Sequence, residues 1–487
     1  MKRIWLNLLW LLPAAFIFQS FNTNKDGYRI EINIKGFSEP YVIMAYHYGD
    51  KPYIQDTVYA KKPGQFIFEG KESLQGGMYM VVMPPKNSTI DMFIDTDNQH
   101  FTVNADLDDL VSKMRFKNSQ NNTLFYTYLE FLNNQRRKSS AIEPELKTAR
   151  EAKNTAKIKE LEAKLIALNN DVKVYQANLI KNNSKTFTAK FIQTSMDVEI
   201  PATVDSTQQY WYYREHYFDN MDLGDGRLMR TPLLPSKVTR YLDQVIPQHP
   251  DSVIVGVDQI LTRAKNSKET YKYFLIRLIN KYAKSKVVCM DAVYVHIADE
   301  YYLKGEADWI DSTQLDKIKD DADRLRPLLC NKIAPNISMN TIPNKEGEAK
   351  KPVSLHGIKA KYTVLMFWAP DCGHCKKTMP KVVEFADKYR KKGVEVFSIC
   401  TKTYKNYQDC VDFVREKDMI RMLNASDPYL RSKFPVIYDI KSTPVIYLLD
   451  ENKKIIGKRL GGEQLGEIID NWEKRAKLLK EQKQKGK

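Results

Sequence analysis

The feature that most constrains this 487-residue chain is a pair of cysteines two residues apart, Cys372-Gly373-His374-Cys375. The pair follows a strand-like apolar run at residues 364–371 and precedes a helical run that begins at Lys376. Two cysteines at such a corner can form and break a disulfide without movement of the backbone. The positive end of the helix dipole favours a thiolate on Cys372, and His374 adds a further donor. The motif therefore predicts thiol–disulfide exchange.

Two other interpretations of the motif are a zinc site and an inert structural disulfide. A zinc site needs two more ligands, usually a second Cys/His pair at short spacing. The remaining cysteines, Cys289, Cys330, Cys400 and Cys410, form no such pair, and His356 is the only other histidine near the motif. Redox chemistry without a metal or another cofactor is therefore the favoured prediction.

Three segments carry a resemblance to a known family. Residues 367–375 resemble the active-site segment of thioredoxin-fold proteins, with the Gly-His dipeptide of protein disulfide isomerase domains. Residues 442–450 resemble the loop of that fold in which the peptide bond before proline is cis and the backbone faces the cysteine pair. Residues 334–337 resemble the opening of the periplasmic TlpA-like branch. The resemblance covers about residues 331–475 and implies a C-terminal α/β thioredoxin fold.

The resemblance also implies a role for each residue of the site. Cys372 would attack a substrate disulfide, and Cys375, one helical turn later, would resolve the mixed disulfide. The supporting residues would be Trp368, Gly373, His374, Thr443 and Pro444. Trp368 would flank the pair, and Thr443 with Pro444 would form the loop that faces the substrate. The alternatives are core packing for Trp368 and an ordinary turn proline for Pro444.

The chain departs from the family at two positions. Met366 stands where thioredoxins carry a buried aspartate, and residues 378–380, Thr-Met-Pro, stand where some TlpA-like proteins carry a glutamate. The usual proton acceptor for the resolving cysteine is therefore absent from both places. Asp371 and His374 are the nearby substitutes, and the sequence does not choose between them.

Length and composition predict several soluble domains. A chain of 487 residues is too long to fold around a single hydrophobic core, so two to four domains are expected. The 43% hydrophobic and 28% charged residues are those of ordinary soluble protein. The formal charge of +16 comes from scattered lysines and a basic end at residues 474–487. No basic motif interleaved with aromatic residues points to nucleic acid, and weak attraction to anionic lipids is the alternative to a merely solvated surface.

The first 22 residues predict export. Residues 1–3 are positively charged at two positions, and residues 4–18 are apolar except for Asn7 and Pro13. This length suits a signal-peptide core and is short for a membrane span. A cleaved signal is favoured and an uncleaved anchor is the alternative. Either places the body of the chain in a bacterial periplasm, where an oxidising environment suits a redox-active pair.

Residues 27–115 predict an antiparallel β domain, a small sandwich or barrel. Residues 28–36 alternate at period two with isoleucine on one face. Similar runs occur at 41–48, 65–69, 78–83 and 89–94, separated in part by glycine-containing turns. The region resembles an N-terminal domain of unknown function that precedes envelope thioredoxin-like domains.

Residues 116–330 predict an all-α domain. An apolar stripe recurs at spacings of three and four from Ile158 to Val172, over about two heptads, which favours a helix hairpin over a long coiled coil. Residues 216–231 resemble a second domain of unknown function in the same envelope proteins. Its acidic residues and His216 match no metal-loop spacing. The thioredoxin-like domain then occupies residues 331–487, with a polar hairpin turn at 340–351.

The other cysteines receive different predictions. Cys400 ends a strand and Cys410 lies in the next helix, at residues 407–416, so a disulfide and two buried free thiols are equal alternatives. Cys289 and Cys330 are interpreted as buried apolar residues of the helical domain.

Two function classes follow. The first is an enzyme, a periplasmic thiol–disulfide oxidoreductase that acts on proteins and exchanges electrons with a membrane donor or acceptor. The Gly-His dipeptide favours oxidase or isomerase activity, whereas TlpA-like relatives are mostly reductants, so the direction stays undecided. The second class is a binding module, in which the β and helical domains capture a protein or peptide and the thioredoxin fold is a scaffold or redox sensor. The sequence does not determine the oligomeric state.

Overall fold

The computed structural model describes residues 27–485, except 97 and 346. The expected signal or anchor at residues 1–22 lies outside the described residues. The described part of the chain divides into two compact units: residues 27–198 with 218–221 and 226–235, and residues 199–217 with 222–225 and 236–485. None of the helices in the described part is long and apolar enough to cross a membrane.

The first unit begins with two four-stranded sheets, in the orders β4-β1-β7-β8 and β3-β2-β5-β6. Their strands are β1 (Tyr28–Lys35), β2 (Tyr41–Tyr48), β3 (Lys51–Tyr59), β4 (Gln65–Gly70), β5 (Gly77–Met83), β6 (Ser88–Ile94), β7 (His100–Asp106) and β8 (Arg115–Lys117). The isoleucines of β1 at positions 30, 32 and 34 are buried, as their alternation predicts. The pairing is antiparallel except between β1 and β7, which run parallel. Two separate sheets agree with the predicted antiparallel β region, and β3, β7 and β8 were not foreseen.

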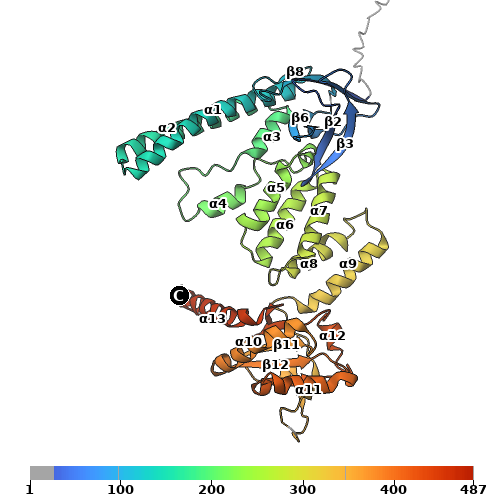
Figure 1. Cartoon of the computed structure of the whole chain (residues 1–487). Helices are drawn as coiled ribbons and strands as arrows, with labels where there is room; N and C mark the ends of the chain where they lie inside the picture. The colour runs from blue at the N-terminus through green and yellow to red at the C-terminus, as the bar shows by residue number, and fades with distance from the viewer. Residues whose placement is uncertain (1–26, 97, 346, 486–487) are drawn as a thin grey trace, which may run out of the picture. The chain divides into compact units, whose positions relative to one another are not determined.

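A helix hairpin follows the sheets in this unit. α1 (Gln120–Glu151) and α2 (Thr155–Asn182) run side by side (Figure 1), joined at residues 152–154. Leu161 of α2 is buried against Leu146 and Ala149 of α1, and the half-buried Ile158 and Leu165 pack beside them. The apolar stripe therefore forms the hairpin seam, and the predicted hairpin is confirmed.

The remaining helices before the C-terminal sheet are α3 (Phe187–Ser195), α4 (Gln209–His216), α5 (Leu233–Arg240), α6 (Pro250–Ala264), α7 (Lys268–Ala283), α8 (Asp291–Ile297) and α9 (Ser312–Leu325). α6 and α7 bury apolar faces that include Val257, Leu261, Phe274 and Leu278. The central region is thus helical, as predicted.

A seven-stranded sheet in the order β10-β9-β13-β12-β11-β14-β15 forms the C-terminal fold. Its strands are β9 (Ser338–Thr341), β10 (Pro352–Ser354), β11 (Tyr362–Trp368), β12 (Val394–Cys400), β13 (Leu423–Ser426), β14 (Val445–Leu449) and β15 (Ile455–Lys458). Its helices are α10 (Gly373–Tyr389), α11 (Tyr407–Glu416), α12 (Phe434–Ile437) and α13 (Leu465–Lys485). β11, β12 and β13 are parallel, and β14 is antiparallel to β11. β9 and β10 form the predicted hairpin.

β11 is buried along its whole length because both faces of the sheet are covered. Its residues 364, 366 and 368 share a core with α10, α11 and α13, and its residues 365 and 367 pack on the other side, with Phe434 and Tyr438. An unbroken apolar run is the sequence pattern of such a central parallel strand. The sheet thereby holds the end of β11, and with it the cysteine motif, in a fixed position.

Two disulfides lie outside the motif. Cys400 and Cys410 are bonded, and both are fully buried. Cys289 and Cys330 are also bonded, so their interpretation as buried apolar residues was wrong. Both are partly exposed and lie 41 positions apart, with Cα atoms 5.6 Å apart. Neighbours that distant along the chain cannot be recognised without the fold.

Candidate active site

The cysteine motif sits at the turn between β11 and α10. Cys372 is the N-cap of α10: its Sγ accepts a hydrogen bond from the backbone N–H of Cys375 at 3.2 Å. The N–H of Lys376 donates to the carbonyl of Cys372 at 3.0 Å, which starts the helix. A sulfur in this position satisfies a backbone donor that the helix leaves free, and it lies at the positive end of the helix dipole.

The two thiols differ in exposure and acidity. Cys372 is half-buried and Cys375 is fully buried. Burial alone would raise the pKa of Cys372, but hydrogen bonds from the Cys375 thiol, Thr443 and the N–H groups of Cys375 and His374 lower it below the usual value. Burial, followed by the hydrogen bond and charge of Cys372, raises the pKa of Cys375 to about 12. The more accessible of the two thiols is therefore the more acidic.

A loop from another part of the chain faces this sulfur. The Thr443–Pro444 peptide bond is cis, as the resemblance implies. The Cys372 thiol lies 3.1 Å from the carbonyl oxygen of Thr443, to which it donates. A cavity of about 350 Å³ adjoins the loop and is lined by Ser442, Pro444 and Arg459 among others. The structure thus brings together the two segments that lie about 70 positions apart in the sequence.

Trp368 lies in the core and is closed to solvent. Its Nε1–H donates to Ser398 Oγ at 2.7 Å, and its ring stacks on Phe413 with centroids 4.8 Å apart. It belongs to the same apolar cluster as Cys375. Core packing therefore describes this side chain. The sequence analysis did not identify Ser398 and Phe413. The alternation of side chains along β12 was the one local signal that could have placed Ser398 on the same face of the sheet as Trp368.

The two candidate proton acceptors have different surroundings. The Asp371 carboxylate pairs with Lys402 at 2.6 Å, and that hydrogen bond lowers the pKa of Asp371. A carboxylate held in an ion pair is a weak base, so Asp371 is poorly suited to take the proton from Cys375. His374 is exposed in the first turn of α10, and Met366 is fully buried where the family has its acid. Lys402 was not foreseen from the sequence.

Gly373 has open space around it. A Cβ built at this position meets no heavy atom within 4 Å, so packing does not require glycine here. Gly373 and His374 both lie on the exposed side of the first helical turn. They form the outer surface over the cysteine pair.

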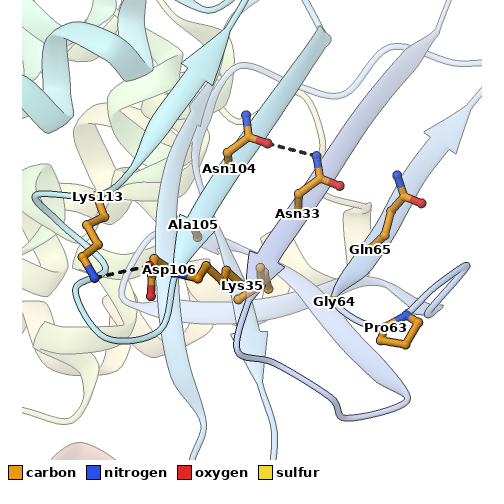
Figure 2. Close-up of a pocket in the computed structure, with 10 residues that line it drawn as sticks. Asn33, Lys35, Pro63, Gly64, Gln65, Asn104, Ala105, Asp106 and Lys113 are labelled. Carbon is orange, nitrogen blue, oxygen red and sulfur yellow. Dashed lines mark hydrogen bonds and ion pairs between the residues drawn. The ribbon is translucent and has the colours of Figure 1, made fainter.

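A second cavity lies in the first unit, on the sheet that contains β1 and β7 (Figure 2). Its volume is about 470 Å³. Asn33 donates to Asn104 at 3.1 Å, and Asp106 pairs with Lys35 and Lys113 at 3.1 and 3.3 Å. These groups satisfy one another, and the cavity holds no cysteine. Within the described part of the chain, no group of three or more histidine, cysteine or acidic residues could hold a metal ion.

Comparisons with known proteins agree with this geometry. Residues 330–457 match the AhpC/TSA family, residues 28–125 match the domain of unknown function DUF4369, and residues 168–326 match DUF5106. The thiol-disulfide oxidoreductase ResA of Bacillus cereus is 26% identical over 144 residues, which are 29% of this chain and 75% of ResA.

Two solved structures are also similar. A domain of a possible thiol-disulfide isomerase from Cytophaga hutchinsonii is 37% identical to this chain. The match covers 31% of this chain and 98% of the solved domain, with a TM-score of 0.28. A thioredoxin-like protein from Bacteroides caccae is 18% identical to this chain. The match covers 56% of this chain and 96% of the solved protein, with a TM-score of 0.43. The C-terminal part of the chain is a thioredoxin-fold domain of the AhpC/TSA family, similar to the thiol–disulfide oxidoreductase ResA. It is an enzyme of that class, preceded by two domains of unknown function.

Proposed function

We propose that this enzyme exchanges disulfides with protein substrates through Cys372 and Cys375. The observation that carries the proposal is the asymmetry of the pair: the accessible sulfur has a lowered pKa, and the buried one has a raised pKa. The thiolate is the nucleophile in thiol–disulfide exchange, so attack begins at Cys372. Trp368 packs in the same apolar cluster as Cys375, while Gly373, His374, Thr443 and Pro444 form the surface that a substrate meets.

The exchange proceeds in two steps. The Cys372 thiolate attacks one sulfur of a substrate disulfide, the substrate S–S bond breaks, and one substrate thiolate leaves. Cys375 then loses its proton and attacks Cys372 in the mixed disulfide, which releases the second substrate thiol and leaves a Cys372–Cys375 disulfide. Two electrons pass from enzyme to substrate. The reverse sequence oxidises a substrate dithiol, and a substrate thiol that resolves the mixed disulfide itself gives isomerisation.

The direction depends on the reduction potential of the pair relative to its redox partner. A lowered pKa of Cys372 stabilises the reduced form and so raises the potential. Equilibration of the protein with glutathione buffers, read by alkylation and mass spectrometry, measures it. A value near about −180 mV or above supports an oxidant or isomerase, and one near about −270 mV or below supports a reductase fed by a membrane donor.

We place the protein in the periplasm, exported by the signal at residues 1–22. The pattern of that segment supports export, and the disulfides Cys289–Cys330 and Cys400–Cys410 suit an oxidising compartment. We further propose domains at 27–115, 116–330 and 331–487, which the matched regions at 28–125, 168–326 and 330–457 support.

A trapping experiment tests the proposed function. In Cys375→Ala, the resolving thiol is gone and mixed disulfides through Cys372 should accumulate with partner proteins in cells. Cys372→Ser is the matched control, because the serine hydroxyl can keep the N-cap of α10 while removing the nucleophile. Non-reducing gels followed by mass spectrometry detect the adducts. If Cys375→Ala accumulates no more adducts than Cys372→Ser, the enzyme does not act on proteins through this pair.

A further inference from the structure

Two exposed tyrosines stack on each other in the C-terminal fold. Tyr404 is 68% exposed and Tyr429 is 62% exposed, although their rings lie 5.5 Å apart at an interplanar angle of 23°. The guanidinium of Arg431 lies 5.4 Å from the ring centre of Tyr429. Single exposed apolar residues are ordinary, but a stacked aromatic pair held open to solvent is a feature of binding surfaces.

The sheet places this pair at the same edge as the cysteine motif. Tyr404 follows β12 and Tyr429 follows β13, and both strands run parallel to β11, whose end leads into Cys372. The carboxyl ends of parallel strands share one edge, where open α/β sheets bind their ligands. The N–H of Tyr404 donates to the carbonyl of Pro428 at 3.1 Å, which joins the two loops.

The loop that carries Tyr404 also contacts residues just before the cysteine motif. Thr401 N–H donates to the carbonyl of Trp368 at 2.8 Å, and Lys402 pairs with Asp371, the residue before Cys372. Tyr404 comes three positions after Thr401, a span of at most about 11 Å. At about 3.3 Å per residue, an extended peptide of about four to six residues spans roughly 13–20 Å, which covers this distance and the remaining reach past Asp371 to Cys372.

Both loops are held in place. The Cys400–Cys410 disulfide closes the loop that carries Tyr404. In the second loop, the buried carboxylate of Asp427 accepts hydrogen bonds from the N–H and Oγ of Ser432 at 2.6 and 2.7 Å. Rings presented on ordered loops lose little conformational entropy when a ligand binds.

The exposed charge around the tyrosine pair is mainly positive. Residues 401–406 and 428–433 contain four cations and no acidic residue, namely Lys402, Lys405, Arg431 and Lys433. Lys402 is paired with Asp371, whereas Lys405, Arg431 and Lys433 are exposed. Such a surface favours a partner with negative charge and apolar or aromatic side chains.

We propose that Tyr404, Tyr429 and the cations beside them, here called the tyrosine platform, bind an extended acidic and aromatic segment of the substrate protein. That segment lies about four to six residues from the substrate cysteine that Cys372 attacks. The inference rests on the proposed exchange function and names the substrate class that the site prefers. The platform binds the segment, and it takes no part in the chemical step.

Peptide mixed disulfides test the platform. Each peptide has one cysteine joined to 2-nitro-5-thiobenzoate, with Tyr and Glu placed five residues away on either side, or Ser and Lys in the same places. Exchange with prereduced full-length protein yields the peptide thiol, the coloured thiobenzoate and the Cys372–Cys375 disulfide. The mixed disulfide of 2-mercaptoethanol with the same leaving group reports exchange without any contact to the platform. Mass spectrometry confirms that Cys400–Cys410 stays bonded after prereduction.

We expect the acidic and aromatic peptides to react about tenfold faster than the Ser and Lys peptides. Tyr404→Ser with Tyr429→Ser should remove most of this preference and leave the 2-mercaptoethanol reaction unchanged. Lys405→Glu with Arg431→Glu should reverse the preference for acidic peptides. Ile420→Ser is the matched control, since Ile420 is 47% exposed and precedes β13, at the opposite edge of the sheet.

The outcomes separate the two proposals. If the protein releases thiobenzoate from neither the peptides nor the small reagent, the proposed exchange function fails. If it reacts with the small reagent but shows no peptide preference, or a preference that survives both double variants, the exchange function stands and the tyrosine platform is refuted. A preference lost equally in Ile420→Ser also refutes it, because the effect would then not belong to the tyrosines.

Discussion

The asymmetry of the cysteine pair makes a quantitative prediction about alkylation. A thiol with a pKa of about 12, as burial gives Cys375, holds on the order of one thiolate in 10⁵ molecules at pH 7. An ordinary cysteine with a pKa of about 8.5 holds about one in 30. Because the thiolate is the reacting species, folded Cys375 should alkylate about three thousandfold more slowly than in the unfolded chain.

The assay follows both thiols in the reduced protein over time. Iodoacetamide is added at pH 7 to native protein and to protein in guanidinium chloride, and the label on each cysteine is quantified by mass spectrometry. Native Cys372 should be labelled first, and faster than in the unfolded chain, because its pKa is lowered. The alkylation rate of Cys375 should rise roughly tenfold per pH unit up to about pH 11. The alkylation rate of a free thiol, by contrast, stops rising above about pH 8.5.

Two results would contradict this reasoning. The first is an alkylation rate of native Cys375 within about tenfold of its rate in denaturant. That rate would mean that burial does not raise the pKa of Cys375. The other is a rate at Cys375 that levels off near pH 8.5, the value of a free thiol. Either would remove the asymmetry on which the order of attack and resolution depends.

Three further predictions concern stability. Ser398→Ala should lower the unfolding free energy of the C-terminal fold by about 1–3 kcal/mol in urea titrations, because the buried Trp368 N–H loses its acceptor, and an unchanged midpoint would contradict it. Replacing both Cys289 and Cys330 with Ala should lower the unfolding free energy by about 4 kcal/mol, because the disulfide closes a loop of 41 positions. A decrease below about 1 kcal/mol would show that the disulfide does not constrain the unfolded chain. In Cys372→Ser, burial still keeps the folded pKa of Cys375 above its unfolded value, so the contribution of Cys375 to stability is full below about pH 8.5 and is lost as the pH rises through the folded pKa. Denaturation midpoints of Cys372→Ser should therefore fall above about pH 8.5, whereas those of Cys372→Ser with Cys375→Ala should lack that component.

Local sequence patterns were enough to predict thiol–disulfide chemistry and the type of most secondary-structure elements. Cys372 and Cys375 are neighbours along the chain, so their spacing and the strand-to-helix change around them are local features that need no tertiary contact. The apolar run of β11, the alternation in β1 and the stripe of α2 are local too, because secondary structure imposes periods of 2 and 3.6 on the residues it buries. The family resemblance supplied the one distant element, the loop at Thr443 and Pro444.

The tertiary structure decided what depends on distant neighbours. The Cys289–Cys330 bond joins positions 41 apart, and the Cys400–Cys410 bond depended on whether the end of β12 meets α11. The ion pair between Lys402 and Asp371 could not be predicted before β12 and β11 were known to be neighbouring strands. The stacked tyrosines lie on two loops that only the parallel arrangement of β12 and β13 brings together. The physical reason is the same in each case: burial, pairing and pKa are set by groups that the fold brings near, and sequence periodicity carries no record of which groups those are.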